Sequence, residues 1–297
     1  MAEDNLPDFR SWGGDKKFVP LTEADIQRET NLPILRYLRN IDVTREGKNK
    51  PLRVLDLGCG RGELVGQLRR LGFDAYGVDR DARFIKAGEI LNRNQDYPIS
   101  ILSVSEISGK TQFEDGFFDV IISNQVLEHV SDLDGIACEM SRVLKINGSV
   151  LNLFPARFRF VEPHYKLPFI HWLPKTKIRK VLLSIFLRLG MASHLFPTYS
   201  LAERVQIIYK FSAEEAFYRP NSIIIKNFRK YGIELNSRRE MKRHLTTYKG
   251  GIMGLIKMLS HIFPIDVLVT NFRHVMLSGT KKTQYTSYET HHEAVKL

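Results

Sequence analysis

The stretch that decides the fold is VLDLGCGRG at residues 54–62, in which an apolar run and an acid precede Gly58, Gly60 and Gly62. A helical pattern begins directly afterwards at Glu63, so the sequence predicts a strand that turns tightly into a helix. Glycines at alternate positions let the backbone take positive φ and bring its amide groups close to a ligand. The dinucleotide fingerprint would need its third glycine at position 63, where the glutamate stands, so a cofactor without phosphate is favoured.

Strand and helix patterns alternate around this loop. The alternation predicts a parallel sheet with right-handed crossovers. A helical pattern before it, Thr22 to Asn40, is expected to cover one edge of the core. Farther along, a helix from Asn221 to Lys230 precedes a strand-like IEL, and residues 272–279 alternate as a last strand. The predicted segments of the alternating part are 52–57, 63–71, 73–78, 81–93, 99–104, 118–123, 132–145 and 148–154.

Two further motifs point to a family. Asp79 ends the second apolar strand, 23 residues after Asp56, where a carboxylate can accept bonds from ribose hydroxyls. The segment FDVIISNQVLEHV follows at residues 118–130. With the glycine loop, these residues resemble the class I S-adenosylmethionine (SAM)-dependent methyltransferases, in particular the bacterial group that methylates small molecules, surface glycans or lipids. The resemblance covers residues 51–151 in detail and the region after 219 loosely. It implies an α/β fold with a doubly wound, Rossmann-like sheet of seven strands, mostly parallel with an antiparallel last strand.

The same resemblance implies SAM as the cofactor and assigns residues to it. Gly58, Gly60 and Gly62 receive its amino-acid end, and Asp79, followed by Arg80, holds the ribose. Asp56 orders the glycine loop and reaches toward the methionine amino group. At the adenine end the choice lies between Ser105 and Glu106, and Asn124 is the expected contact for the middle of the cofactor. At residues 145–148 the sequence KING departs from the family's proline and two glycines but still allows a turn.

Composition and pattern divide the chain into five regions. Residues 1–50 are predicted to form an arm and a helix, and residues 51–154 the SAM-binding core. Residues 155–218, rich in aromatic and basic side chains, are predicted to be an inserted, mainly helical cap over the carboxyl ends of the strands. Residues 219–280 complete the sheet, and the polar residues 281–297 are expected to be a flexible tail.

The most distinctive part of the cap is FVEPHYKLPFIHWLP at residues 160–174, which we interpret as a wall of the acceptor site. His164 lies beside Glu162 and is a candidate catalytic base, because a neighbouring carboxylate can tune an imidazole near neutral pH. His129, after the fourth strand, is a second candidate. Both also have structural readings, since a histidine on a proline-rich loop or at a helix start often only packs or caps. No spacing in the sequence indicates a metal site.

Charge is segregated along the chain. The formal net charge is +11, and residues 1–150 hold 20 Lys and Arg against 24 Asp and Glu, whereas residues 151–297 hold 24 against 9. This asymmetry indicates an anionic partner or a solvated basic surface. The segment Ile178 to Leu189 is a basic amphipathic helix pattern, which fits either a helix packed on the core or one lying on a membrane surface.

The two cysteines, Cys59 and Cys138, offer no disulfide framework, and the acidic start MAEDNLPDFR has no secretory pattern, so a cytoplasmic protein is expected, at or near the inner membrane face. The predicted function is methyl transfer from SAM to a small or lipid-linked acceptor, at an oxygen of a glycan or lipid precursor. The alternatives are an RNA methyltransferase, favoured by charge alone, and a non-catalytic SAM-binding protein. No separate RNA-binding module is apparent.

Overall fold

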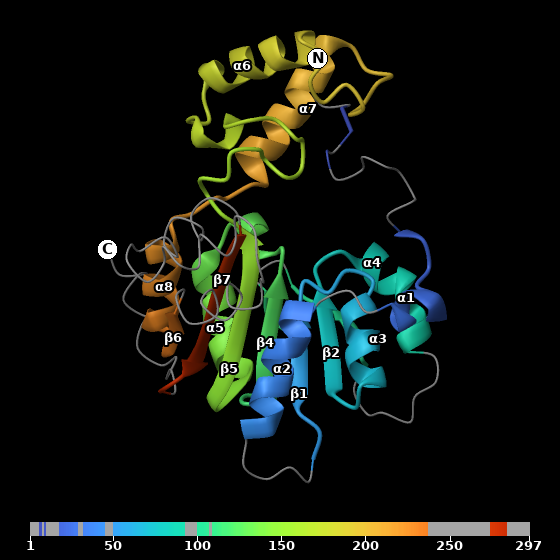
Figure 1. The fold of residues 1–297 in the computed structure, drawn as a ribbon, viewed down its shortest axis with the longest axis vertical. Helices are drawn as coiled ribbons and strands as arrows, with labels where there is room; N and C mark the ends of the chain where they lie inside the picture. Colours follow the sequence, from blue (N-terminus) through green and yellow to red (C-terminus); the bar gives the residue numbers. More distant parts are fainter. Residues whose placement is uncertain are drawn as a thin grey trace, which may run out of the picture.

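A computed structural model describes residues 6, 7, 9, 18–28, 32–44, 50–92, 100–106, 109–236 and 274–283. Its centre is a seven-stranded sheet in the order β3-β2-β1-β4-β5-β7-β6 (Figure 1). The strands are β1 (Arg53–Leu57), β2 (Asp74–Asp79), β3 (Leu102–Val104), β4 (Phe118–Asn124), β5 (Leu144–Pro155), β6 (Ile233–Asn236) and β7 (His274–Lys281). The helices are α1 (Glu23–Gln27), α2 (Leu32–Thr44), α3 (Glu63–Arg70), α4 (Ala82–Ala87), α5 (Leu133–Val143), α6 (Lys177–Arg188), α7 (Leu201–Glu214) and α8 (Asn221–Lys230), with short 3₁₀ turns at Glu89–Leu91, Leu127–His129 and Ile170–Trp172.

Strand directions confirm the predicted fold class. β1 pairs in parallel with β2 and β4, and β4 pairs in parallel with β5. The last strand, β7, runs antiparallel to both of its neighbours, β5 and β6. In a mostly parallel sheet the loops after the strands gather at one edge, and this edge is where α/β proteins bind ligands.

Alternating side chains give the sheet two buried faces. Val54, Val120 and Ile122 pack with α2 and α3 on one face. Leu55 and Ile121 pack with α5 and α8 on the other. Strands covered on both sides are apolar throughout, which explains the near-continuous apolar runs in the sequence.

The helical pattern at residues 22–40 is folded differently from the prediction. It forms two helices, and α2 lies across a face of the sheet instead of at its edge (Figure 1). Ile34 and Leu38 of α2 are fully buried against this face. The hydroxyl of Tyr37 also donates to the carbonyl of Val150 in β5 at 3.0 Å. The three-to-four-residue spacing predicted the buried stripe of the helix but not the surface that it would cover.

Three strand boundaries also differ from the prediction. β5 begins at Leu144 and passes through the KING segment, where Asn147 has a φ of 61° and the pairing with β4 shifts register. β3 is shorter than the predicted segment 99–104, and the last strand runs from His274 to Lys281. Residues 284–297 of the predicted tail lie outside the described residues.

Residues 155–218 carry α6 and α7 and pack around their own apolar cluster beyond the carboxyl ends of the parallel strands (Figure 1). We call this region the cap. Phe9, from the start of the chain, is buried in the same cluster and stacks on Phe211 of α7, with ring centroids 4.3 Å apart. Within the described part of the chain, no helix is both long enough and apolar enough to cross a bilayer.

Candidate active site

The glycine loop between β1 and α3 is built around left-handed backbone. Gly58 has a φ of 75°, and a Cβ placed there would lie 2.3 Å from a methyl group of Val126. Gly60 has a φ of 55° and faces open space. The amides of Gly58 and Cys59 donate to the carbonyl of Val78, at 2.8 and 3.0 Å, which ties the loop to the end of β2. Only glycine meets the steric and conformational demands at position 58 together.

Asp79 organises the same edge of the sheet. One carboxylate oxygen accepts a hydrogen bond from the amide of Gly60 at 2.9 Å, and the other accepts from the amide of Asp81 at 2.9 Å. A side chain held from both sides loses little further freedom when it binds a ligand, which makes it a good anchor for hydroxyl groups.

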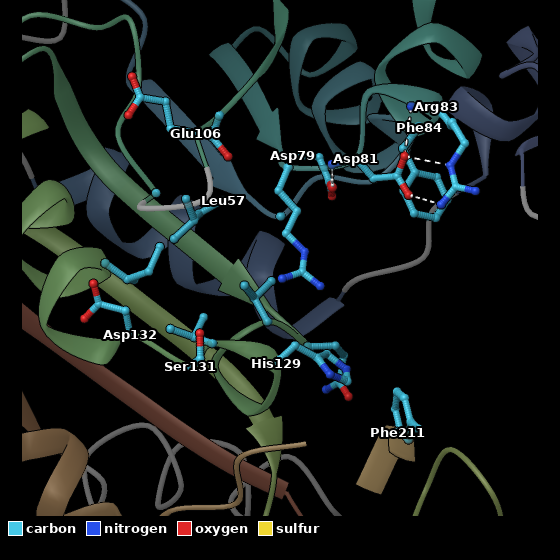
Figure 2. A pocket seen from close by; sticks show the side chains of 18 of the residues that line it. Leu57, Asp79, Asp81, Arg83, Phe84, Glu106, His129, Ser131, Asp132 and Phe211 are labelled. Carbon is cyan, nitrogen blue, oxygen red and sulfur yellow. Dashed lines mark hydrogen bonds and ion pairs between the residues drawn. The ribbon is translucent and has the colours of Figure 1, made fainter. Parts of the chain in front are cut away.

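A cavity of about 330 Å³ opens beside Asp79, between the carboxyl ends of the strands and the cap. Figure 2 shows Asp79 and Glu106 on one side of it and His129 and Phe211 on the other. Its lining carries four acids, Asp79, Asp81, Glu106 and Asp132, against two arginines, one of which, Arg83, is paired with Asp81. An acidic lining repels a pyrophosphate and suits a cofactor whose sulfonium and ammonium groups are cationic. The residues present therefore fit SAM.

The structure brings most of the predicted residues to this cavity. Gly58, Asp79, Arg80, Ser105, Glu106, His129 and His164 all line it. Asp56, Gly60, Gly62 and Asn124 are not among the lining residues. Gly62 faces Leu91 and Leu102 instead, where a Cβ would come within 3.0 Å of their methyl groups. Asn124 is the last residue of β4, and its neighbour Gln125 lines the cavity in its place.

Sequence reasoning missed the apolar part of the lining. Phe9, Phe18, Phe84 and Phe211 contribute aromatic surface from four separate segments. Nothing in the local sequence of these phenylalanines sets them apart from core residues. Gln125 could have been predicted as a lining residue, because it directly follows the end of a predicted strand beside the glycine loop.

Asp56 lies buried beneath the glycine loop. Burial, assisted by the nearby charge of Asp79, raises the pKa of its carboxyl to about 8. The raised pKa favours the neutral form of the Asp56 carboxyl at pH 7 in the free protein. Because the folded pKa lies above the unfolded one, its contribution to stability is complete below about pH 4 and is lost as the pH rises through 8.

We expect SAM binding at pH 7 to release up to one proton from Asp56, since an ammonium group nearby favours the carboxylate. Calorimetric titrations in two buffers of different ionisation enthalpy measure the number of protons released. Asp56→Asn should abolish this release. Equal release by both proteins would show that Asp56 does not respond to the cofactor.

Glu162 holds the candidate base from the cap side. Its carboxylate is fully buried and accepts from Nδ1 of His164 at 2.6 Å and from the hydroxyl of Tyr218 at 2.6 Å. The amides of His164 and Tyr165 donate to its other oxygen, at 2.6 and 2.9 Å. Burial opposes ionisation, but these hydrogen bonds outweigh it and lower the pKa of Glu162. The predicted neighbours Glu162 and His164 thus form a fixed carboxylate–imidazole pair.

The two candidate histidines meet each other. Nε2 of His129 lies 3.1 Å from Nε2 of His164, although the residues are 35 positions apart. Nδ1 of His129 faces the carbonyl of Glu215 at 2.8 Å, and Nδ1 of His164 faces the Glu162 carboxylate. Each Nδ1 must therefore carry a hydrogen, which leaves two Nε2 lone pairs facing each other. One proton between the two Nε2 atoms would satisfy both, so the geometry provides a place where a proton can be held.

Glu128 completes this group. It is buried, and neither of its carboxylate oxygens has a hydrogen-bond partner among the described residues. Burial raises its pKa to about 7. The ligand atoms of Glu128, His129 and His164 lie within 4.8 Å of one another, a spacing that can also hold a divalent ion. This arrangement could not be predicted from the sequence, because Glu128 and His164 belong to different regions of the chain.

With fold and site in place, comparisons with known proteins define the class. Residues 55–152 match a family described as "Methyltransferase domain". The ubiquinone biosynthesis O-methyltransferase of Pelagibacter ubique (strain HTCC1062) is 31% identical over 145 residues, 46% of this chain and 56% of that protein. The demethylmenaquinone methyltransferase of Tropheryma whipplei (strain Twist) is 32% identical over 123 residues, 41% of this chain and 50% of that protein. The chain spans about half the length of the curated relatives it matches.

Among solved structures, phosphoethanolamine N-methyltransferase 2 of Haemonchus contortus, in complex with SAM, has 16% identity and a TM-score of 0.45, covering 84% of this chain and 53% of that chain. Residues 55–152 therefore form a methyltransferase domain, in agreement with the resemblance to the class I SAM-dependent methyltransferases and with SAM as the cofactor. The family and the cofactor predicted from the sequence are thereby confirmed.

Proposed function

We propose that this protein transfers the methyl group of SAM to an oxygen of a small or lipid-linked acceptor, such as a glycan or lipid precursor. The observation that carries the proposal is the histidine pair held by Glu162 at the wall of the cofactor cavity. A hydroxyl must lose its proton to become a good nucleophile, whereas a neutral amine can attack unaided. A histidine positioned to accept that proton therefore favours an oxygen as the atom that receives the methyl group.

Bound SAM supplies an electrophilic methyl group. Asp79 and the glycine loop fix the cofactor's position, and the cap closes the opposite side of the cavity. His164, lacking the shared proton, accepts the proton of the acceptor hydroxyl, while Glu162 keeps its ring oriented and balances the positive charge. Phe9 and Phe211 exclude water from this side and offer apolar surface to the acceptor. The names of two relatives, a ubiquinone biosynthesis O-methyltransferase and a demethylmenaquinone methyltransferase, support a small or lipid-linked acceptor.

His164→Gln tests the proposal. We expect unchanged affinity for S-adenosylhomocysteine, and turnover lowered about a hundredfold or more, the usual contribution of a general base. Turnover is measured as S-adenosylhomocysteine formed with metabolite and lipid fractions, and the product is identified by a mass gain of one methylene. His194→Gln is the matched control, since His194 is exposed on the cap.

Equal activity of the His164→Gln and wild-type proteins would return His164 to a structural role. No turnover with any fraction, together with tight cofactor binding, would instead indicate a non-catalytic SAM-binding protein. An RNA acceptor remains the alternative favoured by charge, and RNA binding that falls steeply with salt would be its signature.

We propose further that the protein meets its acceptor at a membrane surface. Ile178, Val181, Ile185 and Leu189 form a stripe along α6 and are 45–72% exposed. Within the cap, the exposed residues Phe158, Phe160 and Trp172 form a connected aromatic group. Residues 155–200 contain eight lysines and arginines, and their one acid, Glu162, is buried. Apolar side chains bordered by an excess of positively charged residues suit an anionic bilayer surface. In Figure 1, α6 lies on the side of the cap turned away from the sheet.

We expect the double variant Ile185→Glu/Leu189→Glu to bind phosphatidylglycerol vesicles at least about tenfold more weakly than the wild type, because charge replaces two apolar contacts. Vesicle co-sedimentation measures the partition. Ile223→Glu is the control, because Ile223 is an equally exposed apolar residue on α8. Unchanged partition of the double variant would remove α6 from the membrane contact.

A further inference from the structure

A second cavity lies inside the cap, separate from the cofactor cavity. Its volume is about 230 Å³, and it is enclosed by the start of α6, the end of α7 and the segment that follows α7. The side chains that matter in its lining are His171, Lys175, Arg179, Phe217, Tyr218 and Arg219. Three of them are cationic, and none of the described residues that line the cavity is an acid.

Among the described residues, the hydrogen-bond acceptors of the three cations are all neutral. Nζ of Lys175 donates to the carbonyl of Ala213, Nη1 of Arg179 to the carbonyl of Ser212 at 2.9 Å, and Nη2 of Arg219 to the carbonyl of Ser131 at 2.8 Å. In the described part of the chain, none of the ion pairs includes any of the three. Arg179 is 3% exposed, so bulk water does little to compensate its charge.

Such an arrangement is unfavourable on its own. Like charges around one small space repel each other, and the burial of Arg179 strengthens its repulsion from the exposed Lys175 and the half-buried Arg219, because its surroundings are less polarisable than water. Burial and then the charges of Arg179 and Arg219 lower the pKa of Lys175. The ring of Phe217 keeps two of the cations near each other, with Lys175 at 4.7 Å and Arg219 at 5.3 Å from its centre. A bound anion would relieve this repulsion.

His171 adds a polar group without adding charge. The side chain is buried, and neither ring nitrogen has a hydrogen-bond partner among the residues that the structure describes. The carbonyls of Arg157 and Arg159 lie near the ring but do not reach hydrogen-bonding geometry. A buried polar group without a partner costs free energy, and a ligand oxygen in the cavity would supply the missing acceptor.

The donors favour a phosphoryl group over a carboxylate. Two guanidinium groups, with planar sets of N–H donors, and one ammonium can together neutralise two or more negative charges. A single carboxylate would leave most of this positive charge uncompensated. We infer that the cavity between α6 and α7 is a binding site for a phosphoryl anion, held by Lys175, Arg179 and Arg219 with His171 as an additional donor.

The site goes beyond the proposed methyl transfer and does not depend on it. It is nevertheless linked to the first cavity, because Tyr218 lines the phosphoryl site and donates its hydroxyl to Glu162. Glu162 in turn holds His164. An anion beside Tyr218 therefore lies one hydrogen-bonded residue away from the carboxylate that orients the candidate base.

Isothermal titration of the full chain at constant ionic strength tests the inference, with inorganic phosphate, inorganic pyrophosphate and a short-chain phosphatidic acid as probes. The variant is Lys175→Ala, and the matched control is Lys177→Ala, which removes an exposed lysine two positions away. We expect saturable binding by the wild type and the control, and binding about ten- to a hundredfold weaker for Lys175→Ala, as for the loss of a hydrogen bond to a charged group. Arg219→Gln should give a similar loss.

The relative affinities of the probes identify the source of the phosphoryl group. Stronger binding of the phosphatidic acid assigns the site to a lipid headgroup, and stronger binding of the inorganic ions assigns it to a free anion. Affinity for S-adenosylhomocysteine should be the same in all the proteins, which shows that each variant is folded. Equal affinities of Lys175→Ala and Lys177→Ala, or no saturable binding of any probe, would overturn the inference, whatever the methyl acceptor proves to be.

Discussion

Glu162→Gln is expected to lower methyl transfer about a hundredfold or more while leaving cofactor affinity unchanged. The carboxylate accepts four hydrogen bonds, two of them from backbone amides and one each from His164 and Tyr218. A glutamine in its place turns one acceptor into a donor that faces other donors. The ring of His164 then loses its orientation and the negative charge that stabilises its protonated form.

This variant should also change how stability depends on pH. Because the folded pKa of Glu162 is lowered, its stabilising contribution is present above its ordinary pKa and is lost as the pH falls through the folded value. Wild type should therefore be more stable than Glu162→Gln at neutral pH, and the difference should shrink below about pH 4. Thermal melting over this range measures it.

Glu203→Gln is the control for Glu162→Gln, since Glu203 is an exposed acid of the capping box that begins α7 and glutamine preserves that motif. Full turnover by Glu162→Gln, with a melting temperature equal to that of the wild type, would contradict the assigned role of the buried carboxylate.

The second large effect is expected at Asp79. Replacing it with asparagine should weaken binding of S-adenosylhomocysteine about a hundredfold, because the side chain is the proposed anchor of the ribose and holds the amides of Gly60 and Asp81. One of the two amides would then face the NH₂ group of the asparagine, which cannot accept a hydrogen bond. Calorimetry measures the affinity.

Asp74→Asn provides the matched comparison for Asp79→Asn, because Asp74 is the first residue of the same strand and lies at the opposite edge of the sheet. It should bind the cofactor normally. If both variants bind like the wild type, Asp79 is not the ribose anchor.

Local sequence predicted the glycine loop and Asp79 because their roles depend on backbone conformation and on a position directly after a strand. The antiparallel direction of β7 followed from the family resemblance. The lining of the cavities did not follow, because it depends on which distant segments meet. Phe9 reaches Phe211, and His129 reaches His164, only after the cap has folded. The cationic residues of the second cavity likewise come from both ends of the α6–α7 region.

The start of β5 shows a different cause of error. The apolar pattern of α5 continues through Leu144, so periodicity alone extended the helix to residue 145. In the structure the chain is already extended at Leu144, and the left-handed residue Asn147 accommodates the register shift against β4. Tertiary pairing with β4 decided this boundary, and no single-segment pattern contains that information.

The stacking of Phe9 on Phe211 bears on how the protein should be handled in the laboratory. A fragment trimmed to begin at α1 would keep every strand of the sheet yet expose the apolar interior of the cap. Such a fragment would be prone to aggregate and would misreport acceptor preference. Purification tags are therefore better placed at the carboxyl terminus, and soluble expression of a trimmed fragment would not by itself show that its acceptor site is intact.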